Sequence, residues 1–466
     1  MQIIGRKREI KELQRLKESS QAEFVAIYGR RRVGKTWLVR SYFQDQFTFY
    51  TTGIARGNRK EQLQNFYKSI CSYSKSALQQ PNDWYEAFDL LKDVIKRSRQ
   101  RRKVVFLDEL PWMDTQKSEF LKAIDLFWNS WGNMQQNLLF VVCGSAASWM
   151  VKNIIRNKGG LHNRLTCHLH LEPFTLAETK AYLHSQGVRW TDDLVAECYM
   201  VMGGIPYYLH LLDRSLSLAQ NIDRLFFAPN ALLKDEFDTL YKSLFNKSED
   251  YVKIISALSK RRSGYTRDEI VKATGLANGG GLTRKLDELE QCSFIRRYNP
   301  VKGRMAIYQL IDFYSLFYFQ FLNESHHFDR DAWLHFQATP RHNTWLGLSF
   351  ERLCFAHLYA IQKALGITGI ATKTFPMQTP NAQMDMVIVR ADKVTTLCEM
   401  KYTNKPYAIT KQEAEKLRHR AEELSQCFPT QKQVLITLVS NQTPKKNIYY
   451  NSLITNNITL FDLFLE

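Results

Sequence analysis

The segment Gly29-Arg-Arg-Arg-Val-Gly-Lys-Thr36 has the spacing of a loop that binds phosphate groups. An apolar run, Phe24–Tyr28, comes before it, and the stretch Trp37–Phe43 that follows is typical of a helix. In such a loop the backbone N–H groups surround the phosphates, a lysine reaches the β- and γ-phosphates, and a hydroxyl binds Mg²⁺. We therefore expect ATP and Mg²⁺ to bind at Gly29, Arg30, Arg31, Arg32, Val33, Gly34, Lys35, Thr36 and Trp37.

Two carboxylates, Asp108 and Glu109, directly follow the apolar run Val104–Leu107. An acidic pair at the end of a strand is usually part of a solvated loop, but the phosphate-binding loop upstream favours a catalytic role. Asp108 would then complete the Mg²⁺ shell, and Glu109 would orient and polarise the attacking water. We expect Lys35 and Glu109 to be the catalytic residues of ATP hydrolysis.

Three further side chains are candidates for contact with the γ-phosphate. Ser145 follows the apolar run Leu138–Val142 closely and is either a γ-phosphate sensor or an ordinary turn serine. Arg164 could reach the nucleotide of a neighbouring subunit, which would require a homo-oligomer, and Arg156 is the rival for that role. The alternative for both arginines is a basic surface residue.

Six motifs in this order resemble the archaeal-type ATPases, which are P-loop NTPases of the AAA+/STAND class. The resemblance covers roughly the first 310 residues. It implies that the Ile-Gly-Arg segment packs beside the adenine and that the Gly-Gly-Ile-Pro turn belongs to a helical lid. The motifs are Ile4-Gly-Arg-Lys-Arg-Glu9, the phosphate-binding loop, the Asp-Glu pair, Cys143-Gly-Ser145, Leu171-Glu-Pro-Phe174 and Gly203-Gly-Ile-Pro206.

Residues 246–312 have the pattern of three helices and a hairpin, which is the plan of a winged helix. Three leucines of the third helix would face the core and leave Thr283, Arg284 and Lys285 outward. We expect a basic wing formed by Arg296, Arg297, Lys302 and Arg304. Such a surface suits duplex DNA through phosphate contacts, whereas the alternative is a structural unit packed on the ATPase core.

A second candidate site lies in the predicted hairpin of Asp385–Arg390 and Val394–Glu399. A hairpin symmetric about Asp392 sets Asp385 opposite Glu399, with Cβ atoms about 5 Å apart. Carboxylates this close repel unless a cation lies between them, so we expect Mg²⁺ or Mn²⁺ at Asp385 and Glu399. Lys401 would share a face with Glu399 and assist phosphodiester hydrolysis, and both carboxylates should face solvent.

Together with Glu351, these residues resemble the PD-(D/E)xK nuclease fold, in the form of a nuclease-like domain often appended to such ATPases. The resemblance implies that Glu351 contributes to the metal site. The alternative is a surface hairpin whose Glu399 and Lys401 are solvated charges.

The composition limits the class of protein. The chain of 466 residues has 44% hydrophobic residues, a net charge of +18 and eight cysteines without a C-x-x-C pair. The charge favours a polyanionic partner, with nucleic acid first and a membrane surface second. We find no secretion signal or membrane span in the sequence and expect a cytoplasmic protein.

The fold class that we predict is α/β: a P-loop parallel sheet with a helical lid, a winged helix and an α/β nuclease-like domain. The segments would be 1–175 (ATPase), 176–245 (lid), 246–312 (winged helix), 313–344 (linker helix) and 345–466 (nuclease-like). We expect a DNA-associated ATPase with a metal-dependent nuclease domain. The alternative is a STAND-type signalling or scaffold NTPase whose inactive nuclease-like tail binds protein.

Overall fold

The structure is a computed structural model, and it describes residues 3–74, 79–157, 159–245, 247–299, 305–323, 332–337 and 339–465. The chain folds into two compact units. The N-terminal unit comprises Met1–Pro173 with Gln291–Ser293, and the C-terminal unit comprises Phe174–Glu290 with Phe294–Glu466.

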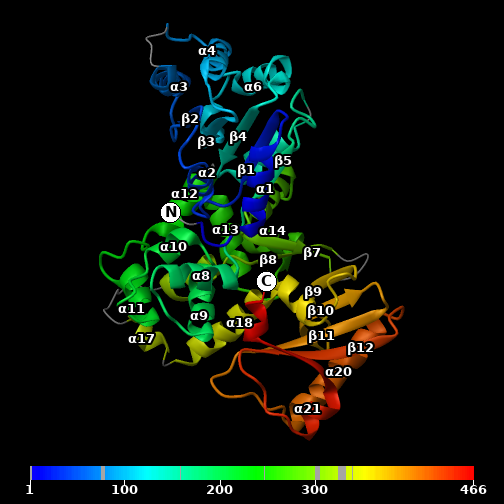
Figure 1. The fold of residues 1–466 in the computed structure, drawn as a ribbon. Helices are drawn as coiled ribbons and strands as arrows, with labels where there is room; N and C mark the ends of the chain where they lie inside the picture. The colour runs from blue at the N-terminus through cyan, green and yellow to red at the C-terminus, as the bar shows by residue number, and fades with distance from the viewer. Residues whose placement is uncertain are drawn as a thin grey trace. The chain divides into compact units, whose positions relative to one another are not determined.

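A five-stranded parallel sheet forms the centre of the N-terminal unit (Figure 1). Its strand order is β2-β3-β4-β1-β5, so β4 lies between β1 and β3. Because the paired strands all run parallel, their carboxyl ends meet at one edge of the sheet. The strands are β1 (Glu23–Tyr28), β2 (Phe49–Thr52), β3 (Lys103–Asp108), β4 (Leu138–Gly144) and β5 (Cys167–His170). The predicted α/β fold with a parallel sheet is confirmed.

Helices connect these strands and bury aromatic side chains against them. The helices are α1 (Lys7–Glu18), α2 (Lys35–Phe43), α3 (Arg59–Ser74), α4 (Trp84–Arg97), α5 (Leu110–Met113), α6 (Phe120–Ser130) and α7 (Ala147–Met150). A 3-10 turn covers Gly132–Met134, and a π-helical turn covers Val151–Ile155. Trp84 and Phe120 pack edge to face at 4.6 Å between ring centroids, in a core formed largely by α3, α4 and α6.

The sequence analysis missed strand β5. Its residues, Cys-His-Leu-His, do not form an apolar run, and the strand lies at the edge of the sheet, where one neighbour, β1, pairs with it. An edge strand needs less apolar surface than a central one such as β4, which is buried along its whole length.

The C-terminal unit begins with a helical segment. Its helices are α8 (Leu176–Ser185), α9 (Asp192–Met202), α10 (Pro206–His210), α11 (Leu218–Ile222) and α12 (Glu236–Leu244), with a π-helical turn at Asp223–Phe227. The sequence Thr175-Leu-Ala-Glu178 predicts a capping box at the start of α8. The structure confirms it, because Thr175 and Glu178 each accept a hydrogen bond from the other's backbone N–H. All regular elements between residues 176 and 245 are helical, as predicted for the lid.

Three helices and a small antiparallel sheet follow. They are α13 (Ser248–Ser259), α14 (Arg267–Thr274), α15 (Gly280–Gln291), β6 (Tyr265–Thr266), β7 (Ile295–Tyr298) and β8 (Ile307–Leu310), with strand order β6-β8-β7. The predicted three helices and hairpin are present, and β6 adds a third short strand. The sequence Thr266-Arg-Asp-Glu269 predicts a capping box at the start of α14, and the structure confirms it. The three leucines of α15, Leu282, Leu286 and Leu289, are buried as expected.

An aromatic segment leads to the last sheet. Its helices are α16 (Phe313–Phe317), continued by a π-helical turn at Tyr318–Leu322, then α17 (Ala332–Gln337), α18 (Pro340–Ala356) and α19 (Leu358–Ala364). The rings of Phe317, Phe321, Trp333 and Trp345 contact one another. Aromatic packing therefore buries this part of the predicted linker helix, 313–344.

The final sheet has the order β13-β12-β11-β10-β9, with β9, β10 and β11 antiparallel and β11, β12 and β13 parallel (Figure 1). Its strands are β9 (Thr372–Gln378), β10 (Gln383–Arg390), β11 (Val394–Lys401), β12 (Gln433–Ser440) and β13 (Ile454–Thr459). The helices are α20 (Lys411–Cys427), α21 (Ile448–Leu453) and α22 (Leu460–Leu463). The hairpin of β10 and β11 has the predicted register, since Met386 pairs with Cys398 and Val389 with Thr395.

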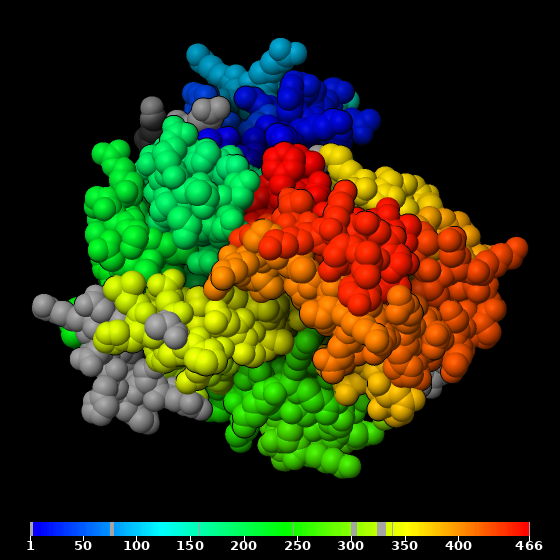
Figure 2. All heavy atoms as spheres, turned by 90° about the horizontal axis from the view of Figure 1, so that it is seen from below, coloured from blue at the N-terminus to red at the C-terminus, as the bar shows by residue number. Residues whose placement is uncertain are grey.

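Contacts within the C-terminal unit tie its first helices to its last elements. Nε2 of the buried His357 accepts a hydrogen bond from the backbone N–H of Leu176 at 2.9 Å. Lys180 Nζ lies 5.3 Å from the centroid of the Phe464 ring, and Figure 2 shows the red C-terminal atoms against the green atoms of this region. The five segment boundaries proposed from the sequence stay predictions. Within the described ranges, no helix is long and apolar enough to cross a membrane.

The turn Gly203-Gly204 after α9 yields a test of the fold. Both glycines have positive φ, but a Cβ at Gly204 would lie 2.4 Å from the carbonyl oxygen of Phe174, whereas at Gly203 the nearest atom is 3.5 Å away. We expect Gly204→Ala to lower the free energy of unfolding by about 2–4 kcal/mol and Gly203→Ala by about 1 kcal/mol. Urea unfolding of both variants measures the difference, and equal losses would contradict the backbone overlap.

Candidate nucleotide site and C-terminal carboxylates

The phosphate-binding loop joins β1 to α2, and its backbone carbonyls accept hydrogen bonds from its own lysine, Lys35. Lys35 Nζ donates hydrogen bonds to the carbonyl oxygens of Gly29 at 3.0 Å and Arg30 at 2.8 Å. The Lys35 side chain is buried, and this burial lowers its pKa. The ammonium group therefore lies inside the loop, where the backbone carbonyls satisfy it.

Thr36 and Asp108 meet at the carboxyl edge of the sheet. Thr36 Oγ1 donates a hydrogen bond to Asp108 Oδ2 at 2.7 Å, so the first turn of α2 is joined to the end of β3. Asp108 is 3% exposed, and burial raises the pKa of its carboxyl group. A buried carboxylate beside a hydroxyl is a donor set suited to a hard cation such as Mg²⁺.

Glu109 and Ser145 form the second polar pair at this edge. Ser145 Oγ donates to Glu109 Oε1 at 2.6 Å, and the Ser145 backbone N–H donates to Oε2 at 3.3 Å. Glu109 has a left-handed backbone conformation, with φ of 45°, directly after β3. Both oxygens of the predicted catalytic carboxylate are thus held by the residue predicted to sense the γ-phosphate.

The sequence analysis gave Arg6 no role of its own, but the structure shows that it joins two loops of the nucleotide site. Its Nη1 donates to the Glu172 carbonyl at 2.7 Å, and its Nη2 donates to the Val33 carbonyl at 3.1 Å. The buried guanidinium therefore fixes the phosphate-binding loop to the chain that follows β5. Its place in the Ile-Gly-Arg motif was the available signal.

The remaining predicted nucleotide residues occupy different environments. Arg30, Val33 and Gly29 are buried, Arg31, Arg32 and Gly34 are half-buried, and Trp37 is 42% exposed. The two finger candidates, Arg156 and Arg164, are both exposed. Burial raises the pKa of Tyr28, at the end of β1, and the charge of Arg156 lowers it.

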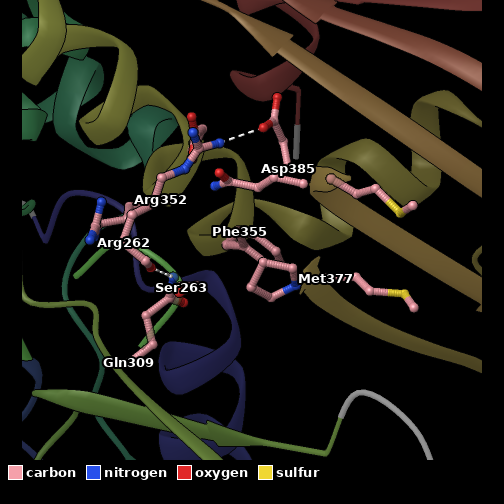
Figure 3. A pocket seen from close by; sticks show the side chains of 11 residues that line it. Arg262, Ser263, Gln309, Arg352, Phe355, Met377 and Asp385 are labelled. Carbon is pink, nitrogen blue, oxygen red and sulfur yellow. Dashed lines mark hydrogen bonds and ion pairs between the residues drawn. The ribbon is translucent and has the colours of Figure 1, made fainter. Parts of the chain in front are cut away.

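The carboxylates of the C-terminal unit are paired with cationic side chains. Asp385 forms a close ion pair with Arg262 (Figure 3). It also accepts a hydrogen bond from the Met400 backbone N–H at 2.9 Å. Glu399 pairs with Lys401 at 2.9 Å and closely with Arg420 of α20. The register of the hairpin, continued by one pair, sets Asp385 opposite Glu399 as predicted.

The expectation that Asp385 and Glu399 face solvent is wrong. The two residues are 8% and 6% exposed, respectively. Helix α20 packs on the sheet and brings Arg420 to Glu399, and the turn after α13 brings Arg262 to Asp385. Burial, together with the charge of Asp385, raises the pKa of Glu399.

Glu351, on α18, shares Arg262 with Asp385 and forms its own close ion pair with it. Burial and the neighbouring charge of Asp385 raise the pKa of Glu351 to about 8, and Arg262 opposes this shift. Glu351 and Asp385 therefore lie close together, as the resemblance implied, but the Arg262 guanidinium pairs with both of them. In the described part of the chain, no group of three His, Cys, Asp or Glu side chains is arranged to hold a metal ion.

Two of the side chains predicted to face DNA, Arg296 and Lys285, are instead engaged with other side chains of the C-terminal unit. The predicted basic surface is therefore wrong at these two positions. Arg296 donates to Gln309 at 2.8 Å and lies over the Phe355 ring, and burial lowers its pKa to about 10. Lys285 pairs with Asp250 at 3.4 Å, and its side chain is 15% exposed. Arg284 and Arg297 remain exposed, while Lys302 and Arg304 lie outside the described residues.

The sequence analysis missed Arg262 and Arg420. Both pair with acidic residues far away in the chain, Arg262 across 123 positions and Arg420 across 21. The spacing of charged residues along the sequence does not predict which of them form ion pairs over such separations. Lys260-Arg-Arg262, a run of three cations, was the available signal at the first position.

Comparisons with known proteins agree with the nucleotide site. Residues 3–212 match a family model described as an ATPase domain predominantly from Archaea. An uncharacterised protein from Methanocaldococcus jannaschii is 26% identical over 375 residues, which cover 78% of this chain and 78% of that protein.

One solved structure shares the fold at low identity, and a second is similar to a lesser degree. The Walker-type ATPase paby2304 of Pyrococcus abyssi superimposes with a TM-score of 0.52 and 18% identity, over 68% of this chain and 96% of that one. The ORC2 protein of Aeropyrum pernix, solved as ADPNP-ADP complexes, has a TM-score of 0.43 and 14% identity, over 72% of this chain and 96% of that one. Together with the P-loop geometry, the match to a family model of ATPase domains indicates an ATPase domain within residues 3–212.

Proposed function

We propose that this chain is a Mg²⁺-dependent ATPase whose site is the carboxyl edge of the five-stranded sheet. The observation that carries the proposal is the contact of Thr36 Oγ1 with Asp108 Oδ2 at 2.7 Å, beside the buried Lys35. These are the hydroxyl, carboxylate and ammonium groups that a site for Mg²⁺-ATP uses. When bound, Mg²⁺ would be held by Thr36 and Asp108 and would neutralise charge on the phosphates.

Each polar group would exchange a protein partner for the nucleotide. Lys35 Nζ would transfer its hydrogen bonds from the Gly29 and Arg30 carbonyls to phosphate oxygens. Ser145 would turn its hydroxyl toward the γ-phosphate and release Glu109. The Glu109 carboxylate would then accept a hydrogen bond from water and orient it for attack.

A homo-oligomer is part of the proposal through the arginine finger. Arg164, exposed in the loop before β5, is our candidate to reach a neighbouring subunit, and Arg156 is the rival.

We also propose duplex DNA as a partner, bound through its phosphates. The net charge of +18 supports this proposal, as do the exposed Arg284 and Arg297, whose side chains are 70% and 49% accessible. Because Arg296 and Lys285 are engaged inside the C-terminal unit, the surface offers fewer cations than the sequence suggested. Electrostatic attraction without base reading is the form of binding that this surface supports.

The predicted nuclease chemistry does not fit the C-terminal carboxylates in this arrangement. Arg262, Lys401 and Arg420 neutralise Glu351, Asp385 and Glu399. We therefore derive no metal-dependent cleavage step at this site. The pairing favours the alternative in which the C-terminal domain has no nuclease activity and serves a signalling or scaffold ATPase.

The ATPase proposal predicts opposite behaviour for two substitutions. Lys35→Ala should weaken ATP binding about 10- to 100-fold, because it removes charge-assisted hydrogen bonds to phosphate. Glu109→Gln should keep ATP affinity within a few-fold and lower turnover about 100-fold or more, because it removes the group that polarises water. Nucleotide titration and phosphate-release assays measure both effects. Wild-type binding and turnover in Lys35→Ala would refute the site.

The DNA proposal predicts a salt-dependent loss on charge reversal. Arg284→Glu with Arg297→Glu should weaken duplex binding similarly for unrelated sequences and lower the slope of log affinity against log salt by about 2. The matched control is Lys96→Glu with Lys122→Glu, which reverses two exposed charges on the N-terminal unit. Fluorescence anisotropy distinguishes the pairs, and equal affinities for both double variants would exclude this surface.

A further inference from the structure

Arg6 joins two segments of the N-terminal unit that are far apart in the chain. Its Nη2 donates to the carbonyl oxygen of Val33 in the phosphate-binding loop, 27 positions away, and its Nη1 donates to that of Glu172, 166 positions away. Arg6 is 5% exposed. A buried guanidinium costs free energy unless acceptors satisfy it, so its two carbonyl partners are held in place relative to each other.

A second contact joins the same two segments at the first residue of the loop. Gly29 has a φ of 145°, and a Cβ there would lie 2.3 Å from the carbonyl oxygen of Leu171. The backbone N–H of Leu171 donates to the carbonyl oxygen of Tyr28 at 2.7 Å. The phosphate-binding loop therefore contacts this segment twice, once through bare backbone and once through Arg6.

Leu171–Pro173, which we call the connecting segment, is where the chain leaves the N-terminal unit. Pro173 is the last residue before the chain enters the C-terminal unit at Phe174. Proline fixes its own φ near −65° and restricts the residue before it, so the backbone of Glu172 and Pro173 has little torsional freedom. The Phe174 N–H in turn donates to the carbonyl oxygen of Gly204 at 2.8 Å. The connecting segment therefore has few free torsions to absorb a shift that begins at the loop.

We propose that Arg6 is a positioning residue that passes the nucleotide state of the phosphate-binding loop to the connecting segment. The proposal rests on the proposed ATPase function and adds the route by which the nucleotide site acts on the chain beyond it. When bound phosphate draws Lys35 away from the Gly29 carbonyl, the loop backbone rearranges beside the segment. Arg6 keeps the segment attached to the loop, so the two move together.

Hydrogen exchange, followed by mass spectrometry, tests whether Arg6 holds the connecting segment. In nucleotide-free protein, Arg6→Gln should speed exchange of the Leu171 amide about tenfold, because the shorter side chain cannot reach both carbonyl groups. Arg6→Lys should do the same, since one ammonium does not replace the two arms of the guanidinium. Arg8→Gln is the matched control, because Arg8 is exposed on α1, and it should exchange like wild type. Wild-type exchange in both Arg6 variants would overturn the proposal.

Addition of Mg²⁺ and a non-hydrolysable ATP analogue tests whether the signal is passed on. In wild type, exchange of the Leu171 amide and of the Leu176 amide at the start of α8 should change about threefold or more. Arg6→Gln should still bind the analogue, about five- to tenfold more weakly, because Lys35 and Thr36 are retained. At saturation, neither amide of this variant should respond. A purely structural Arg6 would leave both responses intact at saturation.

Insertion of Gly-Ser between Pro173 and Phe174 gives a second test in which Arg6 keeps its place. The Leu171 amide should respond to the analogue as in wild type, whereas the Leu176 amide should not, because the flexible insert absorbs the shift. This variant carries the test if the Arg6 variants do not fold by circular dichroism. A Leu176 response that the insertion does not diminish would contradict passage through the connecting segment.

The outcomes distinguish this proposal from the proposed ATPase function. An analogue that binds wild type without changing exchange at Leu171 or Leu176 would leave the nucleotide site intact and overturn the role of Arg6. A response that persists in saturated Arg6→Gln would overturn that role as well. An analogue that does not bind wild type at all would overturn both proposals.

Discussion

The hydrogen bond between Thr36 and Asp108 is the contact on which the nucleotide site depends. It exists because β1 and β3 run parallel on either side of β4, so the loop after β1 and the carboxylate after β3 emerge at one edge. Buried polar groups cost free energy unless they are hydrogen-bonded. At this edge the protein satisfies them internally, through Lys35 with loop carbonyls and Glu109 with Ser145.

The same constraint explains the C-terminal carboxylates. Asp385, Glu399 and Glu351 are largely buried, and each has a guanidinium or ammonium partner. Removing one member of such a pair leaves an uncompensated charge, whereas supplying another cation does not. Both sites therefore satisfy their buried polar groups with protein partners, hydrogen bonds at the nucleotide site and ion pairs at the C-terminal carboxylates.

Local patterns predicted much of the fold and part of both sites. Thr175 with Glu178 and Thr266 with Glu269 form the predicted capping boxes, because a cap depends on residues three positions apart. The register of β10 and β11 followed from the short turn between them. The approach of Thr36 to Asp108 was predictable because their motifs stand at the carboxyl ends of two strands of one parallel sheet, and these ends lie at the same edge.

Long-range pairs were not predictable in this way. Arg262 meets Asp385 because a turn after α13 packs against β10, and no period in the sequence encodes that approach. Arg296 belongs to a predicted basic wing, yet the ring of Phe355 covers it. Strand β5 carries two histidines in four residues and lacked the apolar pattern of the central strands. In each case the neighbour that decides the outcome lies far away in the chain.

The exchange of partners at the carboxyl edge of the five-stranded sheet is the central claim, and a crystal structure with Mg²⁺ and a non-hydrolysable ATP analogue tests it most directly. The account predicts that Lys35 Nζ leaves the carbonyls of Gly29 and Arg30 for phosphate oxygens. It also predicts that Thr36 and Asp108 hold Mg²⁺ and that Ser145 releases Glu109. An analogue bound elsewhere, or bound here with all these protein contacts unchanged, would contradict it.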